Sequence, residues 1–131
     1  MKRELIDYRR NRAKETLRDA KILFDSGSLF SSVNRIYYAM FYQVTALLLT
    51  ENLSSPKHSG VKAFFNTRFV KTGKVSIKNG KFFARMFEFR QKSDYKDFVE
   101  YESNKVIEWF EEARRFIDEL DVVIEREITD Q

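Results

Sequence analysis

The residues with the clearest capacity for chemistry lie at the end of the fourth predicted helix. The apolar face of that helix is formed by Phe82, Phe83, Met86 and Phe87. The same spacing continues to Arg90 and Asp94, which are four residues apart and therefore share this face. An arginine offers a rigid fork of N–H donors that fits a phosphate or a carboxylate. The alternative is an ion pair between Arg90 and Asp94 whose aliphatic stems pack on the phenylalanines.

Two further sets of polar residues stand at helical positions suited to a site. His58, the single histidine, follows Ser55-Pro56-Lys57 at the start of the third predicted helix, where the helix dipole favours a neutral imidazole able to exchange a proton. Arg35, Tyr38 and Tyr42 form a polar-tipped stripe on the second helix, and tyrosines of this kind suit interfaces. The alternatives are an ordinary surface or capping histidine, and plain core or dimer packing.

The composition excludes several classes of site. The chain has no cysteine, which excludes disulfides, iron–sulfur clusters, thiolate zinc sites and cysteine nucleophiles, and a single histidine excludes a histidine-pair metal site. The sequence contains no glycine-rich phosphate loop and no defensible Ser/His/Asp grouping. We therefore expect no metal and no cofactor.

The sequence also gives an expectation for location. No run approaches the about 18 apolar residues that a membrane span needs. The start, Met1-Lys2-Arg3-Glu4, leads into a charged stretch and not into the apolar segment of a secretory signal. We expect a cytoplasmic protein that does not enter a membrane.

Charge is unevenly distributed along the chain. Lysine and arginine number 24 and aspartate and glutamate number 20, which gives a net charge of +4. Residues 57–96 contain eleven lysines or arginines against only Glu88 and Asp94, whereas the segment from Asp97 to Asp130 is rich in acidic residues. A basic middle segment attracts phosphate and is typical of a nucleic-acid binder. The alternative is a solvated face balanced by the acidic last helix.

Hydrophobic periodicity predicts five helices. The predicted ranges are Arg3 to Asp25, Leu29 to Glu51, Pro56 to Lys71, Lys81 to Tyr95 and Glu100 to Glu127. Four glycines and one proline leave little room for the many turns of a β-sandwich or barrel. The prediction is an all-α, five-helix antiparallel bundle in a single domain over residues 1–131, with the third and fourth helices crossing an end or side of the bundle.

Turn chemistry and apolar spacing give finer predictions. We expect Gly27 to be a left-handed C-cap, Ser55 and Pro56 to begin the third helix, and residues 72–80 to form a polar loop. The second helix is apolar nearly all round, which is typical of a helix in the middle of a bundle or in an oligomer interface. The predicted apolar face of the first helix holds Leu5, Tyr8, Ala13, Leu17, Ala20 and Phe24.

Three segments occur in an order and at a spacing typical of one family. They are Arg35-Ile36-Tyr37-Tyr38-Ala39-Met40-Phe41, Lys57-His58-Ser59-Gly60-Val61 and Arg90-Gln91-Lys92-Ser93-Asp94-Tyr95. With these segments the chain resembles the HEPN domain family (higher eukaryotes and prokaryotes nucleotide-binding), and it is most similar to the prokaryotic branch whose fourth helix ends in Arg-x-x-x-Asp-Tyr. The resemblance covers about residues 3 to 127.

The resemblance implies a fold, a partner and a site. It implies a helical bundle that pairs as a two-fold homodimer, with a site at the dimer cleft built by the fourth helix and helped by the second and third. It also implies one component of a toxin–antitoxin pair, with a minimal nucleotidyltransferase as the partner. The residues that we expect to hold a phosphate-bearing ligand, RNA or a nucleotide, are Arg90, Asp94, Tyr95, Arg35, Tyr38 and His58.

The chain departs from the ribonuclease pattern that the resemblance implies. Many family members are metal-independent ribonucleases in which a histidine follows the arginine by four to six residues, and no histidine follows Arg90 at that spacing. Proton exchange with a 2′-hydroxyl near neutral pH usually needs a histidine. Three interpretations stay open: a nucleotide- or RNA-binding module, an RNA endonuclease toxin that uses Arg90 with His58 or Asp94, and a structural dimeric scaffold.

Overall fold

The computed structural model describes residues 2–95 and 99–130, with side chains at 2–93 and 99–130. Along the chain it contains α1 (Lys2–Asp25), α2 (Leu29–Leu49), α3 (His58–Phe65), a π-helical turn η1 (Asn66–Val70), α4 (Ile77–Tyr95) and α5 (Ser103–Thr129). The described residues form helices and no strands. The predicted all-α class and five-helix count are confirmed.

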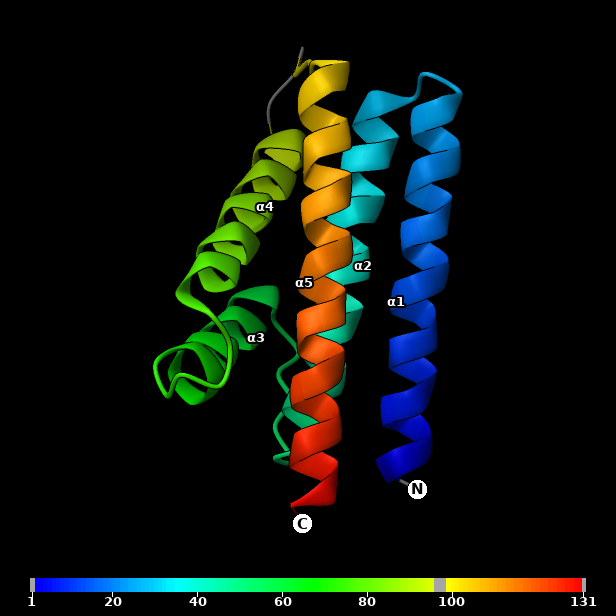
Figure 1. Ribbon diagram of the computed structural model, residues 1–131. Helices are drawn as coiled ribbons and strands as arrows, with labels where there is room; N and C mark the ends of the chain where they lie inside the picture. The colour runs from blue at the N-terminus through cyan, green and yellow to red at the C-terminus, as the bar shows by residue number, and fades with distance from the viewer. Residues whose placement is uncertain (1, 96–98, 131) are drawn as a thin grey trace.

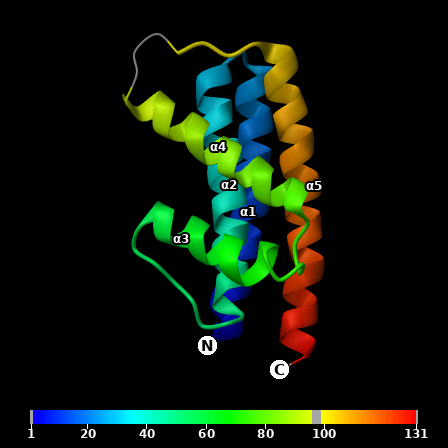
Figure 2. The same cartoon turned by 90° about the vertical axis from the view of Figure 1, so that its left-hand side faces the viewer.

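Three long helices form the body of the bundle, and two shorter ones lie against its side. Figure 1 shows α1 running in the opposite direction to α2 and α5, and Figure 2 shows α3 and α4 crossing one side of this group. The helix α2 contacts α1, α3, α4 and α5, and its buried residues cover more than half of its circumference: Val33, Ile36, Tyr37, Ala39, Met40, Val44, Ala46, Leu47 and Leu48. The prediction that α2 lies in the middle of the bundle is therefore confirmed. Of the helices described, none is long and apolar enough to cross a bilayer.

The ends of α1 and α2 are set by backbone turns of the same type. Gly27 has a φ of 81°, and the Ser28 N–H donates to the Leu23 carbonyl at 2.8 Å. Asn52, with a φ of 59°, occupies the equivalent place after α2, where the Leu53 N–H donates to the Leu48 carbonyl at 3.0 Å. Both are Schellman turns, which need a residue that tolerates the left-handed conformation. The prediction for Gly27 is confirmed, and α2 ends at Leu49 and not at Glu51.

The predicted start of the third helix was wrong by two residues. The helix begins at His58, after Lys57 in an extended conformation with φ −108° and ψ 139°. The Ser55 hydroxyl accepts the Lys57 N–H at 3.2 Å, so it closes a turn ahead of the helix and does not cap the helix itself. The result is that the imidazole, and not the proline, occupies the first helical position.

The predicted start of the fourth helix was also wrong, because Gly80 is a helical residue and not part of a loop. The helix begins at Ile77, and the Ser76 hydroxyl accepts the Asn79 N–H at 3.2 Å as an N-cap. A Cβ at Gly80 would lie 2.9 Å from Val70 Cγ1. The glycine therefore lets α4 pack closely on η1, and its loop-like signal in the sequence has a packing cause.

Two other sequence predictions need correction. Leu5 and Tyr8 of α1 are 40% and 59% exposed, and Ile6 is buried in their place, because the buried face follows Ile6, Ala13, Leu17 and Ala20. The last helix begins at Ser103, three residues later than predicted, and continues to Thr129. The predicted apolar face of α4, formed by Phe82, Phe83, Met86 and Phe87, is confirmed.

Aromatic stacking and one carboxylate fix α4 on the bundle. The Phe83 ring stacks between the rings of Tyr37 on α2 and Phe116 on α5, with centroid distances of 5.9 Å and 5.8 Å. At the start of α4, Glu119 of α5 accepts hydrogen bonds from the Ser76 N–H at 2.8 Å, the Ser76 hydroxyl at 2.9 Å and the Asn79 amide at 2.6 Å. These contacts determine where the far end of α4, with Arg90, can lie.

Replacing Glu119 by alanine is expected to destabilise the protein by about 1–3 kcal/mol, because three donors at the start of α4 lose their acceptor. Urea unfolding measures this change. Asp118→Ala, at an exposed neighbouring position on the same helix, is the control and is expected to change the free energy of unfolding by less than about 0.5 kcal/mol. Equal losses in the two variants would contradict the anchoring role of Glu119.

Candidate functional site

The candidate site is built around Tyr37, a tyrosine in the middle of α2. Its side chain is fully buried, with 0% of its surface exposed. The hydroxyl is 2.9 Å from Nδ1 of His58, the first residue of α3. A buried phenol needs a hydrogen-bond partner, and the single histidine of the chain supplies it. This hydrogen bond joins α2 to α3.

His58 is held between aromatic rings. Its imidazole stacks on Phe41 at a centroid distance of 4.2 Å with 15° between the planes, and the Tyr38 ring is nearly perpendicular to it, with a centroid distance of 5.8 Å. The turn before α3 supports this position, because a Cβ at Gly60 would collide with the Ser55 side chain. Glycine at position 60 thus permits the close approach of the preceding turn, and His58 stays half-buried against α2.

Arg90 of α4 lies over the same pair of tyrosines. Its guanidinium carbon is 5.9 Å from the centroid of the Tyr37 ring and 5.6 Å from that of Tyr38. Arg35 of α2 lies over Tyr38 at 4.9 Å and donates to the side-chain oxygen of Asn34 at 2.8 Å. Cation–π attraction therefore holds two guanidinium groups at one cluster of aromatic rings.

The electrostatics keep Tyr37 neutral. Burial raises the pKa of the Tyr37 hydroxyl well above its ordinary value, the nearby positive charge of Arg90 opposes this shift, and Tyr38 adds to it. The hydroxyl therefore stays protonated at physiological pH, and it can either donate to His58 or accept from it. Because the phenol carries no charge, it does not neutralise the guanidinium groups beside it.

The structure unites four of the six predicted ligand residues in one cluster. Arg90, His58, Arg35 and Tyr38 come from α4, α3 and α2 and lie around the neighbouring rings of Tyr37 and Tyr38. The side chains of Asp94 and Tyr95, the other two, lie outside the described residues. The catalytic candidates Arg90 and His58 are thus neighbours of the same two tyrosines, and the half-buried position of Arg90 agrees with its place on the apolar stripe.

The sequence analysis missed Tyr37 and Phe41 as site residues, because both lie on the apolar stripe of α2. The hydroxyl of Tyr37 could have pointed to a contact with His58. A tyrosine at a fully buried position needs a polar partner, and the chain has one histidine. No group of three or more histidine, cysteine, aspartate or glutamate residues with metal-binding geometry occurs among the residues that the structure describes.

The stability of the protein is expected to fall as the pH rises above 10.0, the ordinary pKa of a tyrosine. In the unfolded chain Tyr37 then ionises, whereas in the folded chain its raised pKa keeps it protonated, so ionisation favours the unfolded state. Urea unfolding between about pH 9 and 11 measures this slope. Tyr37→Phe is expected to have a shallower slope than wild type. Tyr8→Phe, at a position 59% exposed, is the control. If it changes the slope as much as Tyr37→Phe does, the pH dependence does not come from Tyr37.

Comparison with known proteins identifies the family. The model of the HEPN domain matches residues 6–123. The "UPF0332 protein" of Thermotoga maritima is 53% identical over 124 residues, which cover 95% of this chain and 94% of the relative. "Putative toxin MJ0605" of Methanocaldococcus jannaschii is 37% identical over 87% of this chain and 79% of its own length. "Putative toxin MJ0142" of the same organism is 36% identical over 68% of this chain and 60% of its own length. The helical bundle, the three sequence segments and these matches agree, and the chain belongs to the HEPN domain family.

Proposed function

We propose that this chain is a toxin-type HEPN module that binds RNA or a nucleotide, with Arg90 as the central phosphate ligand. The observation that carries this proposal is the position of Arg90 over Tyr37 and Tyr38, beside His58. Two relatives in M. jannaschii have the word toxin in their names, which supports the same class of function.

The chemistry of Arg90 fits a phosphate. The guanidinium lies over two aromatic rings in a half-buried place, and cation–π attraction helps to hold it there. A guanidinium presents planar N–H donors that match two oxygens of a phosphate. Partial burial strengthens that interaction, because the surrounding apolar side chains lower the local dielectric constant.

Arg35 adds a second positive charge at the same tyrosine. It lies 4.9 Å from the centroid of the Tyr38 ring, and the oxygen that it bonds belongs to the neutral carboxamide of Asn34. The guanidinium carbons of Arg35 and Arg90 lie 4.9 Å and 5.6 Å from the centroid of the Tyr38 ring, so an anion bound there would be near two positive charges. The pair is therefore suited to the phosphodiester backbone of RNA or to the phosphates of a nucleotide.

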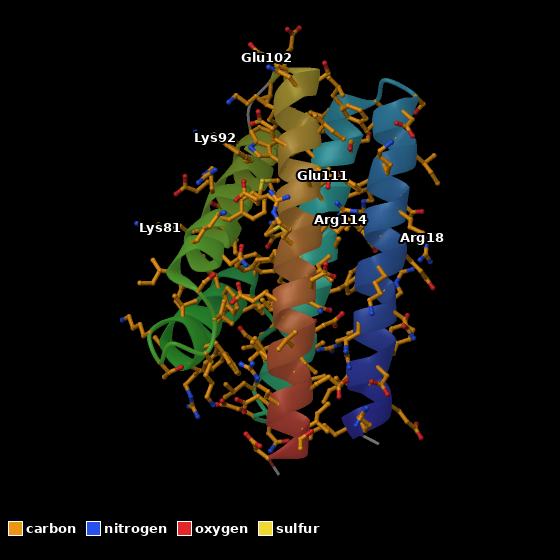
Figure 3. All side chains as sticks on the ribbon, in the orientation of Figure 1. Arg18, Lys81, Lys92, Glu102, Glu111 and Arg114 are labelled. Atoms are coloured by element: carbon orange, nitrogen blue, oxygen red, sulfur yellow. The ribbon has the colours of Figure 1, made fainter. Side chains whose placement is uncertain are left out.

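The surface around α3 and α4 favours approach of a polyanion. Lys62 lies 4.9 Å from the centroid of the Phe87 ring, and Figure 3 shows Lys81 and Lys92 projecting from α4 away from the bundle. Exposed lysines of this kind attract a nucleic acid at a distance and add salt-sensitive affinity without reading its sequence.

The oligomer and the partner are further parts of the proposal and rest on family membership. We expect a two-fold homodimer with Arg90 at its cleft, and a minimal nucleotidyltransferase as the antitoxin component of the pair. Asp94 and Tyr95 belong to the proposed ligand set on their sequence positions four and five residues after Arg90. A cytoplasmic location stays a prediction.

Arg90→Ala is expected to weaken RNA binding at least tenfold. A labelled single-stranded RNA of about ten nucleotides, titrated without divalent metal, reports the affinity by fluorescence anisotropy. The slope of log affinity against log salt is expected to decrease in magnitude by about 0.7 if one phosphate contact is lost. Arg85→Ala, at an exposed position on the same helix, is the control and is expected to keep most of the affinity.

Light scattering and thermal unfolding of the same variants separate binding from scaffolding. The binding proposal expects Arg90→Ala to keep the oligomeric state of wild type. If wild type binds neither RNA nor nucleotides, and Arg90→Ala disrupts the oligomer or lowers its melting temperature, the cluster is a structural one and the proposal is wrong.

Metal-independent RNA cleavage is the second candidate function, and the contact between His58 and Tyr37 favours it. In this reaction the 2′-hydroxyl attacks the adjacent phosphorus, and the bond from phosphorus to the 5′-oxygen breaks. A base takes the 2′-hydroxyl proton and an acid returns one to the leaving oxygen, which gives a 2′,3′-cyclic phosphate and a 5′-hydroxyl. His58 would serve as the base through Nε2, and Arg90 would stabilise the charge on the phosphorane oxygens.

An RNA cleavage assay in EDTA, on wild type, Arg90→Ala and His58→Ala, tests this second candidate. The nuclease interpretation expects cleavage by wild type and at least a hundredfold loss in both variants, because each removes a group used in the transition state. Identification of the cyclic phosphate by mass spectrometry excludes a contaminating metal-dependent nuclease. If none of the proteins cleaves RNA and wild type still binds it, the chain is a binding module alone.

A further inference from the structure

A hollow of about 280 Å³ opens beside His58, between α1, α2 and the connection from α2 to α3. Phe41 and Leu48 are among its apolar lining residues, and Arg9 and Ser55 are among its polar ones. Pockets that hold drug-sized molecules measure about 300–1,000 Å³, so a hollow of this size suits one flat ring system. The site described above does not use it.

The hollow and the Arg90 cluster share a wall. His58 lines the hollow, and its Nδ1 bonds the Tyr37 hydroxyl over which Arg90 lies. Phe41 lines the hollow as well, and its ring stacks on the imidazole. A ligand group in the hollow and a phosphate at Arg90 would therefore be neighbours on two sides of one histidine.

The hydroxyl groups in the hollow suit the edge of a nucleobase. Ser55 accepts the Lys57 N–H and so keeps its own O–H as a donor, whereas Thr45 donates to the Tyr42 carbonyl at 2.8 Å and so keeps its lone pairs as acceptors. A base edge presents both donors and acceptors. Phe41 and Tyr42 line the hollow, and aromatic walls of this kind suit every base.

Cations lie where the backbone of such a strand would continue. Arg9 of α1 lines the hollow, whereas the next residue, Arg10, is held by ion pairs to Asp121 and Glu125 of α5. Arg12, one turn further along α1, lies 5.3 Å from the centroid of the Tyr42 ring at the same hollow. Arginines interleaved with aromatic rings are typical of single-strand binding surfaces.

We propose that the hollow is a nucleobase subsite for single-stranded RNA, in which one base enters beside His58, Arg9 holds the phosphate on one side of that nucleotide and Arg90 holds the phosphate on the other. The subsite rests on the proposed function, because it needs an RNA strand at Arg90. It goes further by assigning a place for one base of that strand, in the hollow beside His58.

The test couples a change in the RNA to a change in the hollow. Ten-nucleotide RNAs that each lack one base are titrated by fluorescence anisotropy against wild type, Arg9→Ala and Thr45→Trp, the last of which fills the hollow. Wild type is expected to lose about fivefold to a hundredfold in affinity when the base that occupies the hollow is missing. Thr45→Trp is expected to bind the intact RNA with a similar loss and to be insensitive to the missing base.

Arg18→Ala on the opposite face of α1 is the matched control for Arg9→Ala, and circular dichroism checks that each variant is folded. If Thr45→Trp does not fold, cross-linking of 4-thiouridine RNA to wild type decides the question, with attachment at Tyr42 or Phe41 as the expected result and attachment confined to other segments as the contrary one. The subsite is wrong, and the proposed function stands, if wild type binds RNA through Arg90 but three further results hold. Every RNA that lacks one base binds wild type as tightly as the intact RNA does, Arg9→Ala binds like Arg18→Ala, and Thr45→Trp binds like wild type. If wild type binds neither RNA nor a nucleotide, both the subsite and the proposed function are wrong, whereas binding of a nucleotide but not of RNA overturns the subsite alone.

Discussion

The burial of one phenol determines how the helices of this protein meet. Tyr37 is fully buried on α2, and an unsatisfied hydroxyl there would cost about 1–3 kcal/mol. His58 satisfies it, so α3 has to begin with its first residue against α2. The same ring stacks on Phe83, so α4 has to pass beside it. The side chain of Tyr37 thus positions α3 through its hydroxyl and α4 through its ring.

The same arrangement explains why positive charge can gather at a half-buried place. Arg90 and Arg35 both lie over aromatic rings, which attract cations but leave their charge intact. Ionisation of Tyr37 would have neutralised one of them, but burial raises the pKa of that hydroxyl and keeps it neutral. Fold stability and the proposed anion affinity therefore depend on the same fact, the removal of Tyr37 from water.

The sequence was sufficient for the fold class, and four of the six predicted ligand residues lie in one cluster, while the failures of the sequence predictions have physical causes. Periodicity identified five helices because their apolar faces are long, and Arg90 was found because it interrupts such a face. The start of α4 was missed because Gly80 looked like a loop residue, whereas close packing of Val70 requires it. Contacts between separate helices leave no mark on local spacing, so the meeting of His58 with Tyr37 had to come from the structure.

Leu5 and Tyr8 show the limit of periodicity within one helix. Their spacing to Ala13 and Leu17 allows a continuous apolar face, but the first turns of α1 turn Ile6 toward the core instead. The register of a helix face is decided by the helix that it packs against, and at its end a small rotation exchanges one residue for the next. A single sequence cannot show whether Leu5 or Ile6 is the buried residue, because both are apolar.

The hydrogen bond between Tyr37 and His58 bears directly on whether the site binds or cleaves. When the Tyr37 hydroxyl donates to Nδ1, a neutral imidazole carries its proton on Nε2, and that N–H can donate to a phosphate but cannot take a proton from a 2′-hydroxyl. Catalysis as a base requires the opposite arrangement, in which Nδ1 donates to the phenol oxygen and Nε2 keeps its lone pair. Binding is compatible with both arrangements, and with a protonated imidazole as well, whereas base catalysis is compatible with one. The direction of this one proton is therefore the feature that separates the proposed binding module from the proposed nuclease.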